Sequence, residues 1–213
     1  MAALVPPTGP PTPNSRHSRS YNQEMNWLAH LLLAEPDVES WVGAVAADWV
    51  KGEARTRFSP GVQRAFAVHR AVDLYTDAHA VVLRSQARIE APYKRYAGVL
   101  IDVFYDYFLS AHWEKYCAQP RKEFIAYVYD ELAAHEPHLP TEVARGFRAM
   151  RDADWLGSYA TVDGIALTLR RLSHRLRPGN LLAEGAAQIV THMDALDADF
   201  REFFPQLREH VST

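Results

Sequence analysis

The sequence is poor in cysteine and lysine and contains no long apolar run. Its single cysteine, Cys117, excludes an intramolecular disulfide bond and a zinc site built from cysteine thiolates. No stretch approaches the roughly 20 apolar residues of a membrane span, and the N-terminal residues lack the apolar core of a secretory signal. Basic and acidic residues nearly balance at a net charge of −3, which does not indicate nucleic-acid binding. We therefore expect a cytoplasmic protein whose partners include neither nucleic acid nor a membrane.

Sequence signals for β-strands are also scarce. Long alternation of Val, Ile and Thr is missing, and no Asn-Gly or Asp-Gly pair joins two such stretches. Apolar residues instead recur at helical spacing, and prolines separate the helical stretches. The sequence therefore predicts an all-α, single-domain helical bundle. The predicted helices cover residues 26–34, 38–50, 62–90, 93–116, 121–135, 141–152 with Thr141 as its cap, 163–177, and 181–210, which Pro205 is expected to kink or end.

Residues 1–24 differ in composition from the rest of the chain. They contain five prolines, together with Ser and Arg, and no long apolar stretch. Such a composition is typical of disorder. We expect residues 1–24 to form a disordered, proline-rich extension and residues 25–213 to form the helical domain.

Histidine and arginine are abundant, with ten histidines and only four lysines among the 23 basic residues. The most informative polar residues lie within apolar helical stretches, because a buried charge costs several kcal/mol unless it is paired or bound to a metal. Residues 101–113 are apolar or aromatic on nearly every face, yet they include Asp102, Asp106 and His112. Asp102 and Asp106 lie one helical turn apart, where like charges repel. A divalent metal or arginines from other helices would relieve that repulsion, and both explanations remain open.

A second polar stripe lies in the predicted helix 62–90. His69, Asp73 and Asp77 are spaced by four residues and share one helical face. A histidine and an aspartate one turn apart can hold a metal ion. They can also form a hydrogen-bonded pair without a metal. The spacing alone does not separate these two interpretations.

His30 and Asp48 each stand as the only polar group in an apolar stretch. A lone histidine of this kind is more often a core residue than a ligand, but one polar site at the centre of a bundle would account for all these groups together. Mixed His and Asp ligands suit Mn²⁺, Fe or Zn²⁺, and a carboxylate-rich site favours Mn²⁺ or Mg²⁺. Such a site indicates a metal-dependent phosphoester hydrolase.

Several of these segments resemble a known family. The stretch 101–113, Ile-Asp-Val-Phe-Tyr-Asp-Tyr-Phe-Leu-Ser-Ala-His-Trp, is the most specific match to the bacterial acyl carrier protein phosphodiesterases, also called holo-acyl-carrier-protein hydrolases. The resemblance implies an all-helical fold, distantly similar to HD-domain phosphohydrolases, and dependence on a divalent metal. It also implies hydrolysis of the phosphodiester that joins 4′-phosphopantetheine to the serine of holo-acyl carrier protein. The other matching segments are 25–31, 43–48, 68–73 with 76–77, and 194–205.

The resemblance also implies which residues form the site. For the hydrolysis that the resemblance implies, we expect Asp102 to act as a metal ligand or as the general base. Arg70 is expected to offset the charge of the phosphate, and His112 to protonate the leaving group or orient a metal ligand. Mn²⁺ is the expected metal, with Mg²⁺, Fe or Zn²⁺ as alternatives. Asp77 also matches a family position. The expected metal ligands are His30, Asp48, His69, Asp73 and Asp106, and the expected catalytic residues are Asp48, Arg70, Asp102 and His112.

Two clusters of arginine would suit the acidic surface of an acyl carrier protein. Each is interpreted either as a docking patch that steers this partner or as a solvated helix face. The first cluster contains Arg145, Arg148 and Arg151, and the second contains Arg170, Arg171 and Arg175.

Two other functions stay open: a metal phosphohydrolase acting on a nucleotide or another small phosphoester, and a non-catalytic helical binding module whose buried acids are salt-bridged.

Overall fold

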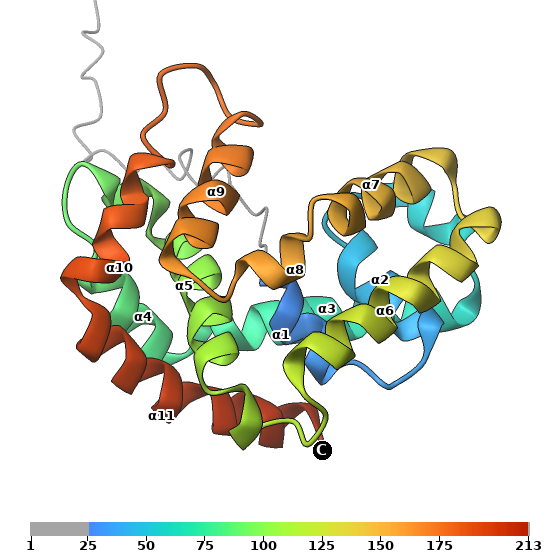
Figure 1. Ribbon diagram of the computed structural model, residues 1–213, viewed down its shortest axis with the longest axis horizontal. Coiled ribbons are helices and arrows are strands. Elements are labelled where there is room, and N and C mark those ends of the chain that lie inside the picture. The colour runs from blue at the N-terminus through green and yellow to red at the C-terminus, as the bar shows by residue number, and fades with distance from the viewer. Residues whose placement is uncertain (1–25, 213) are drawn as a thin grey trace, which may run out of the picture.

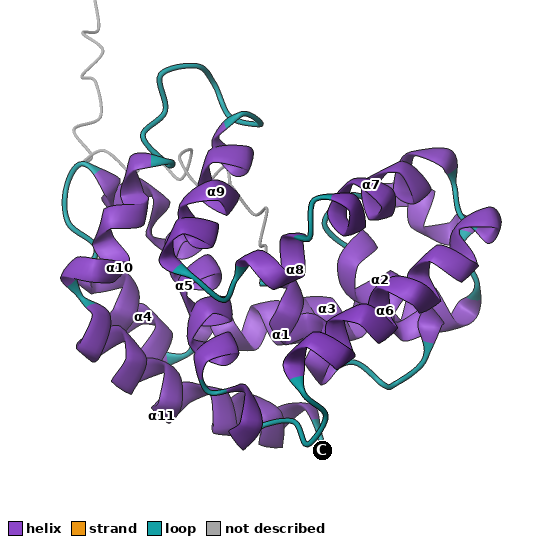
Figure 2. Cartoon of the chain, in the orientation of Figure 1, coloured by secondary structure: helices purple, strands orange, loops and turns teal. Residues whose placement is uncertain are grey.

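The structure, a computed structural model, describes residues 26–212 and consists of helices and connecting loops (Figure 2). No β-strand occurs in this range, which confirms the all-α prediction. The predicted extension, residues 1–24, lies outside the described residues. The α-helices are α1 (Trp27–Leu33), α2 (Val38–Ala46), α3 (Pro60–Ala78), α4 (Ala80–Arg88), α5 (Ala97–Ala111), α6 (Arg121–His135), α7 (Thr141–Asp152), α8 (Trp155–Ser158), α9 (Val162–Ser173), α10 (Ala187–Thr191) and α11 (Met193–Val211). The 3₁₀ helices are η1 (Gly52–Arg57), η2 (Tyr93–Tyr96), η3 (Trp113–Lys115), η4 (Glu136–His138) and η5 (Glu184–Ala186).

The helices gather into two groups that share one hydrophobic core (Figure 1). The first group contains α2, α6 and α7, and the second contains α4, α5, α9, α10 and α11. Helix α3 packs on α2 in the first group and on α4 and α11 in the second, while α1 contacts both α2 and α5. The two groups therefore form a single helical domain, as predicted, with α1 and α3 at their junction. No described helix has the length and apolar character that a bilayer span requires.

Local sequence signals explain where several helices begin. Asp37 caps α2 by accepting a hydrogen bond from the Ser40 backbone N–H, and Ser59 caps α3 in the same way, with Pro60 as its first residue. Helices α2 and α3 approach closely at Gly43, where a Cβ atom would collide with the Cβ of Ala65. This close approach matters for the site described below, because it brings the backbone of α2 against α3.

The structure corrects several predicted helix boundaries. The predicted helix 62–90 is two helices, because His79 adopts an extended backbone that ends α3, and its ring Nδ1 then accepts a hydrogen bond from the first turn of α4. Thr141 is the first residue of α7 and not its cap, which is Pro140. Pro205 does not end the last helix, since α11 continues to Val211.

The predicted helix 121–135 coincides with α6, whereas several other predicted helices are longer than those observed. The stretch 38–50 is α-helical only to Ala46, and the stretch 163–177 only to Ser173. In 93–116 the α-helical part is α5, flanked by the 3₁₀ helices η2 and η3. The stretch 181–210 is divided into η5, α10 and α11. Helix ends are set by capping and packing, which apolar periodicity does not report.

A buried carboxylate, Asp199, joins α11 to α4. Asp199 accepts hydrogen bonds from the Ser85 hydroxyl at 2.8 Å, from Arg84 Nε at 2.9 Å and from Arg88 Nε at 3.0 Å. Burial would raise the pKa of Asp199, but these hydrogen bonds outweigh burial and hold the pKa below its ordinary value. The ionised form of Asp199 therefore stabilises the folded state.

We predict that Asp199→Asn lowers the free energy of unfolding by about 1–3 kcal/mol near neutral pH, because it removes charge-assisted hydrogen bonds inside the fold. Since the folded pKa lies below the unfolded value of about 4, this contribution is complete above that value and is lost as the pH falls through the folded pKa. Urea unfolding of both proteins across this range should therefore show the two stabilities converging in acid. Asp130→Asn, at an exposed position on α6, is the matched control. A gap between wild type and Asp199→Asn that is independent of pH would contradict the prediction.

Candidate functional site

Two stacked histidines and an aspartate form a compact cluster where α1 meets α3. The rings of His30 and His69 lie 3.8 Å apart between centroids and are nearly parallel. The two oxygens of Asp73 approach them, Oδ1 at 3.1 Å from His30 Nε2 and Oδ2 at 3.2 Å from His69 Nε2. Ligand atoms of these three residues all lie within 4.8 Å of one another, the spacing that a single metal ion requires. The structure therefore brings together three of the residues expected in the site.

Asp48 joins this cluster from the turn that follows α2. Its Oδ1 lies 3.5 Å from His69 Nε2, and its Oδ2 accepts a hydrogen bond of 2.8 Å from the indole N–H of Trp27. Trp27 also stacks on Trp155, with ring centroids 5.4 Å apart. An aspartate held this firmly presents its free lone pairs in a fixed direction, toward the histidine.

The second ring nitrogen of His69 explains the orientation of its imidazole. Nδ1–H donates to the backbone carbonyl of Ala44 at 2.9 Å, which the close approach of α2 and α3 makes accessible. This hydrogen bond directs Nε2 toward the carboxylates of Asp48 and Asp73. A second hydrogen bond of this kind is the usual way that proteins orient a metal-binding histidine.

The electrostatics of the cluster indicate a place for positive charge. Burial would lower the pKa of His69, but hydrogen bonds to Asp48 and Asp73 outweigh it and raise the pKa to about 9. Burial and the positive charge of His69 lower the pKa of His30. Nε2 of His30 is buried and makes no hydrogen bond of standard geometry within residues 26–212, despite its proximity to Asp73.

Two further carboxylates add to the negative charge around the histidines. Burial and the negative charges of Asp77 and Asp73 raise the pKa of Asp102, which projects from α5, well above its ordinary value. Burial and the charge of Asp73 likewise raise the pKa of Asp77. Burial is the larger cause at both residues, and repulsion between the ionised carboxylates adds to it. A bound cation would remove this repulsion.

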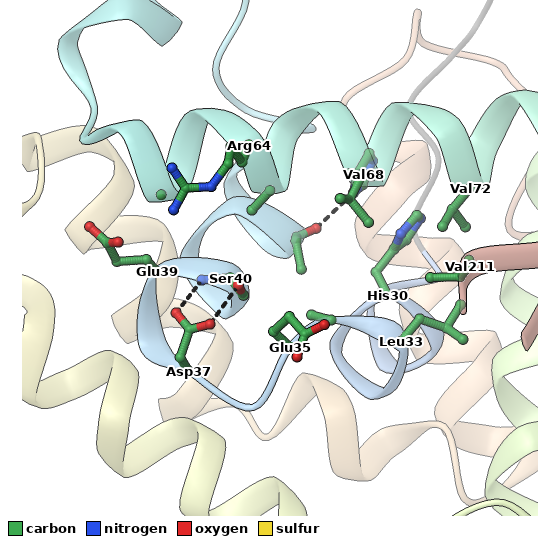
Figure 3. A pocket seen from close by; sticks show the side chains of 15 residues that line it. His30, Leu33, Glu35, Asp37, Glu39, Ser40, Arg64, Val68, Val72 and Val211 are labelled. Atoms are coloured by element: carbon green, nitrogen blue, oxygen red, sulfur yellow. Dashed lines mark hydrogen bonds between the residues drawn. The ribbon is translucent and has the colours of Figure 1, made fainter. Parts of the chain in front are cut away.

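The cluster lies between two hollows that share His69. The polar hollow, of about 190 Å³, opens between the end of α2 and the outer face of α3. The apolar hollow, of about 310 Å³, lies between α1, α2 and α3, and Figure 3 shows His30 reaching toward α3 beside Val68 and Val72. Acidic groups and Arg64 line the rim of the apolar hollow. The polar hollow is lined by Ala47, Asp48, Lys51, Arg55, His69, Arg70, Asp73, Leu74 and Asp77.

Asp106, expected as a metal ligand, has a different set of partners. Its side chain is completely buried, and its two oxygens accept hydrogen bonds from the backbone N–H groups of Leu28 and Ala29, at 3.1 and 3.0 Å. Asn26, the residue at the N-cap position of α1, makes no capping hydrogen bond with its side chain. Asp106, on α5, thus accepts hydrogen bonds from free N–H groups at the start of α1, although the two helices are far apart in the sequence. Burial raises the pKa of Asp106 even though these hydrogen bonds lower it.

The described contacts of His112 likewise do not include the residues of the cluster. Its Nε2 pairs with Asp197 on α11, and its ring is stacked near Phe200. This arrangement joins the end of α5 to α11. The structure therefore does not bring His112 together with the residues around His69.

The two arginine clusters differ in their surroundings. On α7, Arg148 and Arg151 lie 3.6 and 3.9 Å from the carboxylate of Glu136. At the end of α9, Arg171 and Arg175 lie over the ring of Trp155, at 5.5 and 6.0 Å from its centroid. Because Trp155 stacks on Trp27, the second cluster borders the site and the first does not.

The residues that hold the site in place were not predicted from the sequence. Trp27 and Trp155 read as core aromatics, and the carbonyl of Ala44 carries no sequence signal at all. Lys51 and Arg55 lie in the polar hollow because the chain turns back after α2. Only the position of Trp27 within the matching segment 25–31 could have pointed to its role.

We predict that Asp106→Asn destabilises the protein by about 1–3 kcal/mol, because the amide NH₂ would face a buried backbone N–H of α1. Urea unfolding in the presence of a chelator should show this loss, since it arises at the start of α1 and not from a metal. Asp37→Asn, which keeps a capping side chain at the exposed start of α2, is the control and should change stability much less. A loss of stability that appears only when metal is added would contradict this role for Asp106.

Comparison with known proteins identifies the family. The family model described as acyl carrier protein phosphodiesterase matches residues 25–207. Relatives named acyl carrier protein phosphodiesterase include those of Photorhabdus laumondii (31% identity, 87% of this chain and 94% of the relative), Yersinia pestis (30%, 86% and 95%) and Escherichia coli K12 / DH10B (29%, 88% and 98%). No solved structure matches the chain, so the expected similarity to HD-domain phosphohydrolases stays a prediction. The chain belongs to the acyl carrier protein phosphodiesterase family.

Proposed function

We propose that this protein hydrolyses the phosphodiester between 4′-phosphopantetheine and the serine of holo-acyl carrier protein, and that it does so in the cytoplasm. The products are apo-acyl carrier protein and free 4′-phosphopantetheine. The observation that carries the proposal is the cluster of His30, His69, Asp73 and Asp48, which lies beside the polar hollow and its Arg70 in a chain of this family. A divalent metal on such residues, with an arginine beside it, can offset the negative charge that develops during phosphoester hydrolysis.

The donor set fits a divalent metal. Two imidazole nitrogens and two carboxylates suit Mn²⁺, Fe or Zn²⁺, and the additional carboxylates nearby favour Mn²⁺ or Mg²⁺. The Nε2 atom of His30 that lacks a hydrogen bond, and the Nδ1–H of His69 held by Ala44, are the features expected of ligands. A divalent metal, when bound, acidifies a water molecule and offsets negative charge on the phosphoryl oxygens. We propose Mn²⁺ held by His30, Asp48, His69 and Asp73.

The remaining residues have roles that follow from their positions. Arg70 lines the polar hollow and can donate paired hydrogen bonds to the phosphate. Asp102 takes up a proton from the attacking water or completes the ligand set. As water attacks phosphorus, the bond to the serine oxygen breaks, and that oxygen acquires the proton that the attacking water lost, which Asp102 returns when it acts as the base. Asp106 and His112 act as positioning residues, which hold α1 and the end of α5 respectively.

We predict that the protein with Mn²⁺ reduces the mass of holo-acyl carrier protein by one phosphopantetheine group, as followed by mass spectrometry. Asp73→Asn should lower kcat by at least about 100-fold and reduce the bound metal, because Asp73 lies against both histidines. Asp130→Asn, on the exposed face of α6, is the control. Full activity of Asp73→Asn would contradict the proposed site, and turnover of small phosphodiesters without turnover of the carrier would contradict the proposed substrate.

Trp27 offers a test of how Asp48 is oriented. Trp27→Phe keeps an aromatic ring against Trp155 but removes the N–H that donates to Asp48. We expect metal affinity to fall about tenfold, as for other residues that orient a ligand. Metal titration measures this effect. The matched control is Trp41→Phe, whose indole N–H has no hydrogen-bond partner among the described residues. Equal losses in both variants would indicate a packing effect and contradict the orienting role.

A further inference from the structure

The chemistry of the proposed substrate restricts where a carrier protein can bind. The bond that breaks joins phosphorus to the serine oxygen, so only the serine Oγ and Cβ lie between the reacting phosphorus and the backbone of the carrier. The folded surface of the carrier must therefore reach the opening of a hollow that leads to His69, and the polar hollow is the one that also contains Asp48, Arg70 and Asp73. A docking surface elsewhere on the molecule would not bring this bond to the cluster.

The opening of the polar hollow carries both cations and an exposed apolar side chain. Lys51 and Arg55 lie on one side, and Arg70 and Leu74 project from α3 on the other. Arg55 is held in place because Nε donates to the Val50 carbonyl at 2.9 Å and its NH2 group donates to the Ala47 carbonyl at 2.9 Å. Its guanidinium also lies over the ring of Phe66. The positive charge of Arg55 is thus fixed at the rim before any partner binds.

Leu74 is 58% exposed, more than most large apolar residues on this protein. Its neighbours on the outer face of α3 include the exposed alanines Ala67, Ala71 and Ala78, which leave room for another protein to approach closely. The exposed leucine offers one apolar contact, and the cations beside it form a polar rim such as protein interfaces have. The alanines add no specificity of their own, and the charged rim supplies it.

We propose that the surface formed by Lys51, Arg55, Arg70 and Leu74 docks the acidic carrier protein with its modified serine over the polar hollow. This inference rests on the proposed function. The arginines of α7 fit the role less well, because Glu136 partly neutralises Arg148 and Arg151. The arginines at the end of α9 border the site at Trp155, but neither cluster lines the polar hollow. Carboxylates of the carrier meet the rim cations, and an apolar residue of the carrier covers Leu74.

Steady-state kinetics on holo-acyl carrier protein test the proposal. Lys51→Glu and Leu74→Ala are suitable because both side chains are exposed. We expect Lys51→Glu to raise the KM for the carrier about tenfold at low salt and less at high salt, since the effect is electrostatic. Leu74→Ala should raise this KM with little dependence on salt. The same ester on a short serine peptide lacks the carrier surface, so its KM should change far less than that of the carrier.

Matched variants control for general effects of substitution. Lys122→Glu reverses an exposed lysine on α6, and Leu83→Ala shortens an exposed leucine on α4. Neither should raise the KM for the carrier. Bound metal, measured in every variant, shows whether the cluster is intact.

The outcomes separate this inference from the proposed function. If the wild-type protein releases phosphopantetheine but Lys51→Glu and Leu74→Ala leave the KM for the carrier unchanged, the docking surface is wrong and the function stands. If Arg145→Glu raises this KM and Lys51→Glu does not, the carrier binds on α7 instead. If the wild-type protein releases no phosphopantetheine from carrier or peptide, the proposed function itself fails.

Discussion

The repulsion among carboxylates around two stacked histidines is the constraint on which the rest of this structure depends. Asp48, Asp73, Asp77 and Asp102 concentrate negative charge beside the core, and burial together with these neighbouring charges raises the pKa of Asp102 well above its ordinary value. A cation at the centre relieves this repulsion while the carboxylates stay ionised, whether it is an imidazolium on His69 or a metal ion. A helical bundle tolerates such a group of charges because the surrounding side chains and backbone hold each one in a fixed position.

The scaffold around the cluster is arranged to hold those positions. Asp106 satisfies the N-terminal N–H groups of α1 and so places His30, while the Ala44 carbonyl orients His69 and Trp27 orients Asp48. Each of these contacts comes from a different helix. The junction of the two helix groups is therefore the place where the most precise geometry of the molecule is required, and α1 and α3 meet there.

The helices and the residues of the cluster were largely predictable from the sequence, whereas the different roles of Asp102 and Asp106 were not. Apolar periodicity predicted the α6 and α7 boundaries correctly, and the spacing of His69 and Asp73 placed both on one face. Asp102 and Asp106 give the same signal, an acid in an apolar helix, yet one faces the other carboxylates and one caps α1. A difference of about one turn decides which neighbour each side chain meets, and no local pattern contains that neighbour.

The sequence by itself determined the fold class and the residue types of the site, because acids and histidines buried in apolar helices need polar or charged partners. Its resemblance in several segments indicated the family. The tertiary structure alone decided which of these groups share that site. It gave Asp106 and His112 hydrogen-bond partners other than the histidines of the cluster, brought Lys51 and Arg55 to the polar hollow, and divided the long predicted helix at His79. The physical reason is that a hydrogen bond or a charge contact acts over a few ångströms of space, and only folding sets which distant residues come that close.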